Sequence, residues 1–564
     1  MVQGGQLCNL PCLTRSDLSR HKIIPFLAPL CIFLFGCGIA MWFGRQGLNA
    51  LDSTIVFDGA WRRMSGQAFF QDFATPNGFV PIAMQVLFFK VFGVNWLAYC
   101  LHSALMNGLF GLLTFDILRR VGSPRWLAAA YGVLGTVVFY PPMGVPYMEQ
   151  HAFFFLLLAV WIVMKGAQLP EKGRFGLWLA LPTVCLLAIL SKQSPGLFAL
   201  PITGIALAAW VPWRAWGRLL VALLIGLVPA LLVFWLLMGW PGDIWPQFWE
   251  NFWIRPRATG GERLGDWDYG FWKSVRTLLW YPFQALSGLN LIHRYLLYLP
   301  FLLALVEWGY RKWKGLSQPD DSSLRLLLLG TGMVVTCSVF MHLTYNQAEN
   351  GLPLVMVAIG LGHQYYRARI QKWIAGRTPA FQRAFLGASI MLLGYTALCT
   401  WDFHTRVNVP RHVLDFDATF PYRSDAADRE QVGFLDYQAA YHYQVLRPAT
   451  FLSWIRTQDG NFLLFGDLSI LYGLSGRPSV SPFLWIHEGL TLPKRAEPAF
   501  AAADQALESA TRKFDIRYVV FENRALQTWK GIRLEDFPQT CASLTTRQFR
   551  TLEVGGFLIW ELMR

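Results

Sequence analysis

Eleven long apolar runs dominate this sequence of 564 residues and restrict the folds open to it. A helix that crosses a bilayer needs about 20 predominantly apolar residues. Its backbone must also satisfy its own hydrogen bonds inside the hydrocarbon. The runs cover residues 24–43, 96–118, 126–142, 150–164, 175–190, 196–211, 219–239, 291–306, 326–344, 353–366 and 385–401. We therefore predict an all-α multi-pass membrane domain with about 11 transmembrane helices.

The composition supports this interpretation. Apolar residues make up 54% of the chain and charged residues only 15%, whereas soluble proteins carry about 25% charged residues. A plain soluble enzyme and a disordered chain are therefore excluded. The formal net charge is +14, but the basic residues cluster in short stretches between the apolar runs. In membrane proteins, connections rich in Lys and Arg stay in the cytoplasm, and this rule explains the pattern. The positive net charge therefore does not indicate a nucleic-acid partner, and we expect none.

One further apolar run, from Phe79 to Val94, decides the topology. It is short and contains Gln85 and Lys90, which is typical of a juxtamembrane helix that lies flat at the membrane surface. If this run does not cross, all basic connections lie on one side, which is then the cytoplasm. These connections fall at 15–22, 119–125, 165–174, 214–218, 311–325 and 367–383. We therefore expect a multi-pass membrane protein whose C-terminus lies outside the cytoplasm.

This topology divides the chain into three expected parts. They are a cytoplasmic segment at 1–23, a membrane domain at 24–401 with a first outer loop at 44–95, and an outer domain at 402–564. The last part has an ordinary soluble composition. Its pattern predicts buried strands at Asn461–Gly466 and Arg517–Glu522, an amphipathic helix at Pro498–Phe514 and a closing strand pair at Thr551–Leu562. We expect a small α/β domain outside the membrane.

Acidic residues just after the first apolar run are candidates for chemistry. Asp52 lies a few residues beyond that run, and Asp58 follows within the same short helical pattern. Taken alone, Asp52 is explained equally well as a helix N-cap. Asp58 is explained equally well as an ion-pair partner of Arg62 at i+4.

Two further charged residues lie at outer ends of apolar runs, where a charge without a partner or a function is costly. Glu149 precedes the run at 150–164, and the neighbouring His151 could bind a metal, although a lone histidine more often makes a structural hydrogen bond. Lys192 lies between two runs, where its ammonium group suits a phosphate. The alternative for Lys192 is a side chain that extends to the membrane surface.

Several motifs are shared with a known group of proteins. Between Asp52 and Gly93 they are Ala60-Trp61-Arg62, Gly66-Gln67, Phe70-Gln71-Asp72-Phe73, Pro76, Gly78 and Phe88-Phe89-Lys90-Val91-Phe92-Gly93. Farther along they are Glu149 before a Phe/Leu/Ala run, Ser191-Lys192-Gln193, Tyr345–Pro353 and Phe465–Pro478. Together these features resemble the GT-C class of membrane glycosyltransferases. More narrowly, they are similar to the protein O-mannosyltransferase and lipid A aminoarabinose transferase superfamily, in its bacterial polysaccharide-type branch.

The resemblance implies a catalytic role for the acidic residues. Such enzymes move a sugar from a polyprenyl-phosphate carrier to an acceptor on the outer face of the membrane, with inversion. The resemblance implies a protein of the cell inner membrane, with the loop at 44–95, the active site and the domain at 402–564 in the periplasm. Asp52 would be the general base, and Asp58 would take this role if the register is shifted. Glu149 would orient the acceptor or, together with Asp52, hold a divalent metal ion. No other cofactor is implied.

The resemblance also implies a set of substrate-binding residues. Lys192 would bind the leaving phosphate, together with a basic residue of the Trp-rich loop at 240–290 such as Arg255 or Arg257. Gln193 and Arg62 complete this expected set. The partners would be the polyprenyl-phosphate sugar, membrane lipids, and an acceptor that is a lipid-linked glycan, lipid A or a protein.

Other functions compete with this interpretation. An oligosaccharide ligase or polymerase of a lipid-linked polysaccharide pathway would also be multi-pass and act outside the cytoplasm. A secondary transporter would be expected to show interrupted helices in two related halves, and the sequence shows no such repeat. A non-catalytic scaffold would need no carboxylates at the helix ends.

Overall fold

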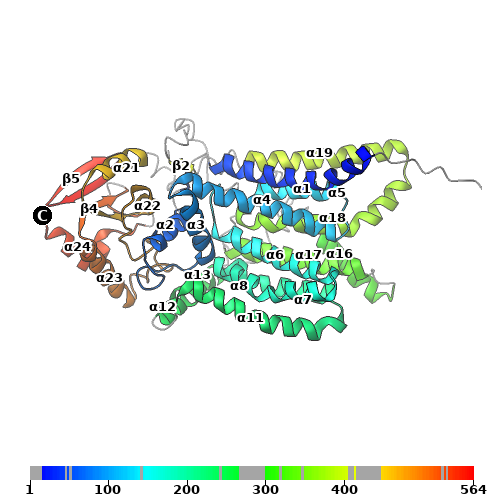
Figure 1. Cartoon of the computed structure of the whole chain (residues 1–564), viewed down its shortest axis with the longest axis horizontal. Coiled ribbons are helices and arrows are strands. Elements are labelled where there is room, and N and C mark those ends of the chain that lie inside the picture. Colours follow the sequence, from blue (N-terminus) through cyan, green and yellow to red (C-terminus); the bar gives the residue numbers. More distant parts are fainter. Residues whose placement is uncertain are drawn as a thin grey trace, which may run out of the picture.

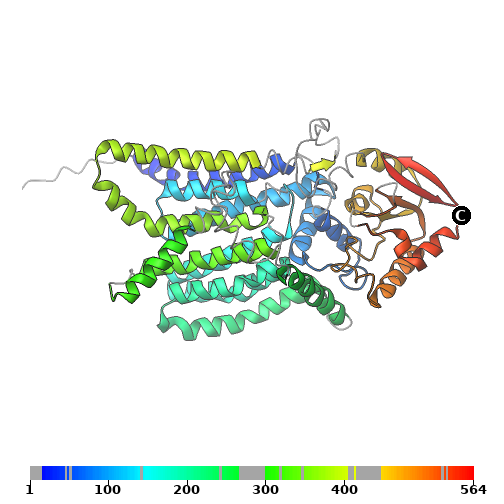
Figure 2. The same cartoon turned by 180° about the vertical axis from the view of Figure 1, so that it is seen from behind.

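The computed structural model shows a bundle of helices with a small sheet at one end (Figure 1). It describes residues 15–44, 48–49, 54–139, 144–239, 244–265, 299–316, 321–343, 348–403, 412–414, 446–522, 526–528 and 531–563. The long helices run side by side along the longest axis of the molecule in both views (Figures 1 and 2). The predicted class, a helical membrane domain with a small C-terminal α/β unit, is confirmed.

Within the described residues, each expected apolar run overlaps a helix or a pair of helices. They are α1 (Arg15–Gly44), α4 (Trp96–Arg120), α5 (Arg125–Phe139), α6 (Met148–Gln168), α7 (Glu171–Leu179), α8 (Leu181–Ser191), α10 (Ala199–Trp210), α11 (Trp216–Met238), α16 (Leu299–Trp313), α17 (Asp321–Leu343), α18 (Ala348–Ala375) and α19 (Pro379–Phe403). The run at 175–190 is divided between α7 and α8, and Pro182 lies in the first turn of α8, where its missing N–H costs nothing.

Not all of these helices have the length and hydropathy of a membrane span. Among the described residues, 5 stretches do, namely Leu27–Gly44, Trp96–Arg120, Met148–Gln168, Glu171–Ser191 and Trp213–Met238. The other runs form helices that fall short in length or hydropathy over the described residues. The expectation of about 11 spans therefore stays a prediction.

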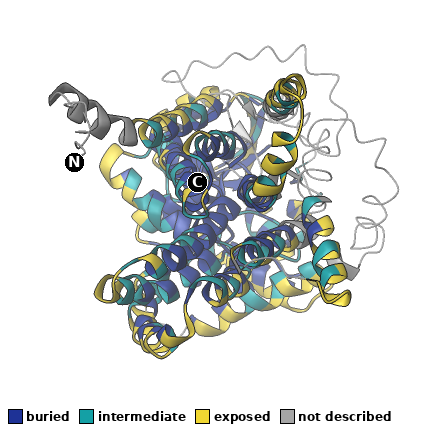
Figure 3. Cartoon of the chain, turned by 90° about the vertical axis from the view of Figure 1, so that its right-hand side faces the viewer, coloured by how far each residue is buried: buried dark blue, intermediate teal, exposed yellow. Residues whose placement is uncertain are grey.

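The bundle has a packed interior and an apolar outer surface. The membrane-length stretch in α6 is 78% buried, whereas that in α11 is only 22% buried. Exposed side chains of α11 include Leu224 and Leu236, at 66% and 81%. Figure 3 shows buried segments in the middle of the bundle and exposed ones around it. A soluble monomer rarely exposes an apolar surface of this extent, so these helices face lipid and the chain is an integral membrane protein.

Two short helices lie at the same end of the bundle as the sheet (Figures 1 and 2). They are α2 (Ile55–Met64) and α3 (Phe79–Phe92). The 14 residues of α3 span about 21 Å, which is less than the hydrocarbon core of about 30 Å. Phe79 and Phe89 on α3 are buried, whereas Leu87 and Val91 are 62% and 72% exposed. This arrangement is compatible with the flat juxtamembrane helix predicted for 79–94.

Reporter fusions test that topology. We expect a reporter fused after Gly122 to be cytoplasmic and one fused after Arg564 to be periplasmic. The basic connections all lie in the cytoplasm only if residues 79–94 do not cross the membrane. The measurement is the activity of reporters that work on one side of the membrane only. A periplasmic signal at Gly122 or a cytoplasmic signal at Arg564 would contradict the proposed topology.

The C-terminal sheet has the strand order β3-β4-β6-β5. β3 (Asn461–Phe465) and β4 (Ile516–Phe521) are parallel, β6 (Phe557–Leu562) joins β4 antiparallel, and β5 (Phe549–Val554) pairs with β6. The helices of this unit are α21 (Pro448–Thr457), α22 (Ile470–Ser475), α23 (Ala499–Lys513) and α24 (Pro538–Thr545). The predicted strands and the helix between them are confirmed. The expected domain boundary near residue 402 is not tested.

The beginning of the first loop also pairs with the chain that follows α19. β1 (Leu48–Asn49) lies antiparallel to β2 (His412–Leu414). The first loop is therefore bonded to a segment more than 350 residues later, which places it at the base of the C-terminal unit.

Candidate active site

The first loop packs against the C-terminal sheet through α2. The hydroxyl of Thr54 donates a hydrogen bond of 2.9 Å to the carbonyl oxygen of Asp467, which follows β3. The indole N–H of Trp61 donates one of 2.9 Å to the carbonyl oxygen of Arg477, which follows α22. These bonds hold α2 against the loops at one edge of the sheet.

Asp58 and Arg62 form the buried centre of this contact. Both side chains are 0% exposed, and Nε of Arg62 lies 2.7 Å from Oδ2 of Asp58. The hydroxyl of Ser479 donates a hydrogen bond of 2.6 Å to Oδ1 of Asp58, and Nη1 of Arg62 donates one of 2.6 Å to the carbonyl oxygen of Ser481. Burial raises the pKa of the Asp58 carboxyl, although the charge of Arg62 acts in the opposite direction. The i+4 pair considered for Asp58 is therefore present.

The partners of this pair explain its place in the structure. Nη2 of Arg62 also faces the carbonyl oxygen of Phe483, at 3.5 Å, so every nitrogen of the guanidinium group has a protein partner. The two side chains hold α2 to the chain between α22 and α23. This geometry favours a structural role for Asp58 and Arg62. Their expected roles toward substrate remain untested.

We expect Asp58→Asn to lower the free energy of unfolding by about 3–5 kcal/mol, because it leaves Arg62 as a buried cation without a counter-charge. The measurement is thermal unfolding of the purified protein in detergent. Arg512→Met is the matched control, because Arg512 pairs with Glu508 at i+4 but is 75% exposed, and such surface pairs contribute about 0–1 kcal/mol. Equal melting temperatures for the two variants would contradict the structural role.

Glu149 and Lys192, the two charged residues predicted at helix ends, form an ion pair between Oε1 and Nζ. Glu149 lies in the first turn of α6 with its side chain 2% exposed, whereas the side chain of Lys192 is 23% exposed. Lys192 is an extended residue, with φ of −159°, at the break between α8 and α9 (Gln193–Leu197). The break directs a partly exposed ammonium group toward a buried carboxylate.

The residues next to Lys192 hold this break in place. The amide nitrogen of Gln193 donates hydrogen bonds to the carbonyl oxygens of Pro76, at 2.5 Å, and Phe252, at 2.6 Å. The backbone N–H of Gly78 donates one of 3.0 Å to the carbonyl oxygen of Ser191. Gln193 thus ties the helix break to the start of α3 and to the Trp-rich loop. These contacts give Gln193 a positioning role.

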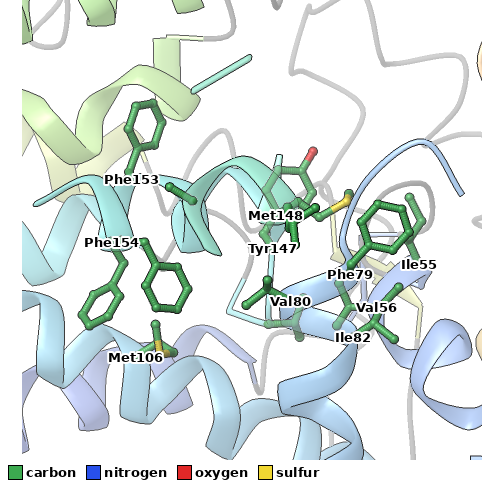
Figure 4. Packing of buried hydrophobic residues seen from close by; sticks show 14 of the residues in the cluster. Ile55, Val56, Phe79, Val80, Ile82, Met106, Tyr147, Met148, Phe153 and Phe154 are labelled. Atoms are coloured by element: carbon green, nitrogen blue, oxygen red, sulfur yellow. The ribbon is translucent and has the colours of Figure 1, made fainter. Parts of the chain in front are cut away.

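The start of α3 also packs closely against the start of α6. Gly78, with φ of 89°, precedes α3, and a Cβ there would lie 3.1 Å from Sδ of Met148. The backbone conformation therefore favours glycine at this position, and a side chain there would also require Met148 to shift by a few tenths of an ångström. Figure 4 shows Met148 and Tyr147 beside Phe79 and Val80. This apolar packing lowers the local dielectric, which strengthens the interaction between Glu149 and Lys192.

The basic residues expected from the Trp-rich loop lie in α13 (Arg255–Gly265), after α12 (Trp245–Trp249) and the π-helical turn η2 (Glu250–Ile254). Arg255 is paired, with Nε 3.1 Å from Oε1 of Glu250 and Nη1 3.2 Å from Oδ1 of Asn251. Arg257 is exposed. The hydrogen bond from Gln193 to Phe252 anchors the beginning of this segment beside the helix break.

Asp52, the expected general base, lies outside the described residues. The nearest described position is Thr54, which is buried and bonded to Asp467. Within the described part of the chain, no three His, Cys, Asp or Glu side chains form a group that could hold a metal ion. A metal shared by Asp52 and Glu149 therefore remains untested.

A buried polar chain at the same end of the bundle was only partly predicted. His151 bonds to the carbonyl oxygen of Tyr147 at 2.7 Å through Nδ1 and to Nε2 of His102 at 3.0 Å through Nε2. Nδ1 of His102 lies 2.9 Å from Oε1 of Gln85. The structural hydrogen bond considered for His151 is present. The sequence contained one indication of the partner of His151. His102 is a polar residue inside the apolar run at 96–118, and a polar residue there requires a buried partner.

The helices and the sheet together define a multi-pass membrane protein with an extramembrane mixed sheet, the architecture expected from the GT-C resemblance. One solved structure with this fold is that of ArnT from Cupriavidus metallidurans in the apo state. It matches over 96% of this chain and 98% of that chain, with a TM-score of 0.50 and 14% sequence identity. The expected similarity to the fold of the lipid A aminoarabinose transferase is therefore confirmed. No protein-family model and no curated protein matches the sequence.

Proposed function

We propose that this protein is an inverting glycosyltransferase that takes a sugar from a polyprenyl-phosphate carrier on the periplasmic face of the inner membrane. The observation that carries the proposal is the ion pair of Lys192 with Glu149 at a broken helix, in an ArnT-like fold. A partly exposed ammonium group beside a buried carboxylate is a suitable site for a phosphate that arrives from the lipid.

The proposed reaction needs little from the protein apart from a base, a phosphate-binding cation and positioning. The acceptor hydroxyl oxygen attacks the anomeric carbon, and the bond from that carbon to the phosphate oxygen breaks. The electron pair of this bond leaves with the polyprenyl phosphate. Asp52 takes the acceptor proton, and Lys192 stabilises the negative charge of the leaving phosphate. Glu149 orients Lys192 and the acceptor.

The route of the lipid substrate follows from the exposed face of α3. Leu87, Val91 and Phe92 are 62%, 72% and 52% exposed, at the end of the bundle where the helix break lies. A polyprenyl chain in the outer leaflet would lie along this apolar face. The sugar and the acceptor are not identified by these features. The acceptor classes are a lipid-linked glycan, lipid A or a protein.

The test is incubation of the purified protein in lipid with a panel of polyprenyl-phosphate sugars and candidate acceptors. We expect one donor to be consumed and free polyprenyl phosphate to be released. If only a polyprenyl-diphosphate oligosaccharide is consumed, the protein is a ligase or polymerase of a lipid-linked pathway. If folded protein consumes neither type of donor, the transferase proposal is wrong.

A further inference from the structure

Residues of α7 and of the start of α11 line a cavity of about 520 Å³. These parts of the two helices lie at the end of the bundle opposite the C-terminal sheet (Figures 1 and 2). The residues that line it include Glu171, Lys172, Arg174, Phe175, Trp178 and Arg218. These residues are far from the candidate active site, and none of them has a part in the proposed transfer.

The walls of the cavity carry excess positive charge from two separate elements. Lys172 and Arg174 belong to α7 and Arg218 to the first turn of α11, against a single acidic residue, Glu171. Glu171 forms an ion pair with Arg218, and both side chains remain exposed, at 59% and 69%. Lys172 is exposed as well. Three cations against one carboxylate leave a net attraction for an anion.

Arg174 is held in place before any ligand binds. Its guanidinium group donates hydrogen bonds of 3.2 Å and 3.1 Å to the carbonyl oxygens of Gly166 and Leu169 at the end of α6. Its Cζ also lies 5.6 Å from the centre of the Trp178 ring, which is buried and forms part of the cavity wall. This cation therefore loses little conformational freedom when an anion binds nearby.

The surroundings of the cavity match a molecule with a charged head and apolar tails. Beyond Arg218, α11 presents exposed apolar side chains, including Leu220 at 53% and Leu224 at 66%. Trp213, which precedes Arg218 in the chain, is 84% exposed, and the centre of its ring lies 6.0 Å from the centre of the Trp216 ring. Exposed tryptophans of this kind mark the level of the lipid headgroups. The cavity thus lies where the headgroup region meets the lipid-facing surface of α11.

We propose that this cavity binds the phosphate headgroup of an anionic phospholipid, whose acyl chains lie along the exposed face of α11. Basic pockets between transmembrane helices are known to suit such headgroups. Arg218 and Lys172 contact the phosphate, while Arg174 adds fixed positive charge. A free phosphate ion would gain nothing from the apolar face of α11, which favours the lipid as the occupant. The proposal does not depend on the transferase function.

The experiment measures lipids retained by the purified, delipidated full-length protein, using native mass spectrometry with added phosphatidylglycerol, cardiolipin or phosphatidylcholine. We expect the two anionic lipids to bind and the zwitterionic lipid not to bind. Each charged contact with phosphate is worth about a tenfold change in affinity. Lys172→Gln combined with Arg218→Gln removes two such contacts and should therefore weaken anionic-lipid binding by about 100-fold.

Two further variants make the test specific. Arg214→Gln is the matched control, because Arg214 is an exposed cation of the neighbouring 3-10 turn that does not line the cavity. It should bind anionic lipid as the wild type does. Glu171→Gln should strengthen binding several-fold, since it releases Arg218 and removes the only carboxylate among the described residues that line the cavity.

Three results would overturn the proposal. The first is an equal loss of binding in Arg214→Gln, which would show general attraction to a basic face. The second is unchanged binding in the Lys172/Arg218 double variant. The third is complete displacement of the lipid by inorganic phosphate at millimolar concentration, which would show a site for a free anion.

Discussion

Replacement of Lys192 by Met is expected to reduce kcat/KM for the polyprenyl-phosphate donor by roughly 10- to 150-fold. A hydrogen bond to a charged group contributes about 1.5–3 kcal/mol, and each 1.4 kcal/mol corresponds to about a tenfold change. The phosphate is bound in the ground state and gains negative charge in the transition state, so the donor KM should rise and kcat should fall. Lys192→Arg should be partly tolerated, because it keeps the charge in a different shape.

The ion pair with Glu149 requires a control for this prediction. Methionine at position 192 also removes the ammonium group that pairs with the nearly buried carboxylate of Glu149, which lowers stability by itself. The double variant Lys192→Met with Glu149→Gln removes both charges and should recover much of the lost melting temperature. Its donor kinetics should remain impaired. Wild-type kinetics in Lys192→Met or in the double variant would remove Lys192 from the site.

Asp52→Asn is expected to abolish transfer while the protein still folds. General base catalysis contributes about 10²- to 10⁴-fold to the rate, and the amide of asparagine cannot accept the acceptor's proton. Asparagine keeps the volume of the side chain and much of its ability to cap a helix. The measurement is the rate of donor consumption at saturating acceptor, together with the melting temperature.

Asp58→Asn is the comparison variant for Asp52→Asn, because it changes the same functional group six residues later. From the buried pair with Arg62 we expect Asp58→Asn to lose stability, and to retain transfer at temperatures where it is folded. Near-normal transfer by Asp52→Asn, with a fully folded but inactive Asp58→Asn, would identify Asp58 as the base.

The positions of the helices and strands could be predicted from the sequence, because they depend on local patterns. The apolar run at 96–118 became α4, and the short apolar run at Asn461–Gly466 became β3. In lipid a backbone must bond within its own segment, so a long apolar run leaves few alternatives to a helix. The charged ends of these runs were also visible as candidates. Glu149 and Lys192 stood out because a charge there requires a partner or a function.

The partners of the polar groups depended on the tertiary structure. The sequence pattern around Asp58 predicted Arg62 as its ion-pair partner. It did not indicate Ser479 or Ser481, which lie about 420 residues farther along and form the remaining hydrogen bonds of the two side chains. In the same way Gln193 reaches Pro76 and Phe252, and the basic cavity needs both α7 and α11. Hydrophobic periodicity reports which face of an element is buried, whereas the packing of distant elements decides which groups meet. Buried polar atoms must find partners in a low dielectric. The contacts between distant elements therefore determine which charged residues have a structural role and which remain accessible to a substrate.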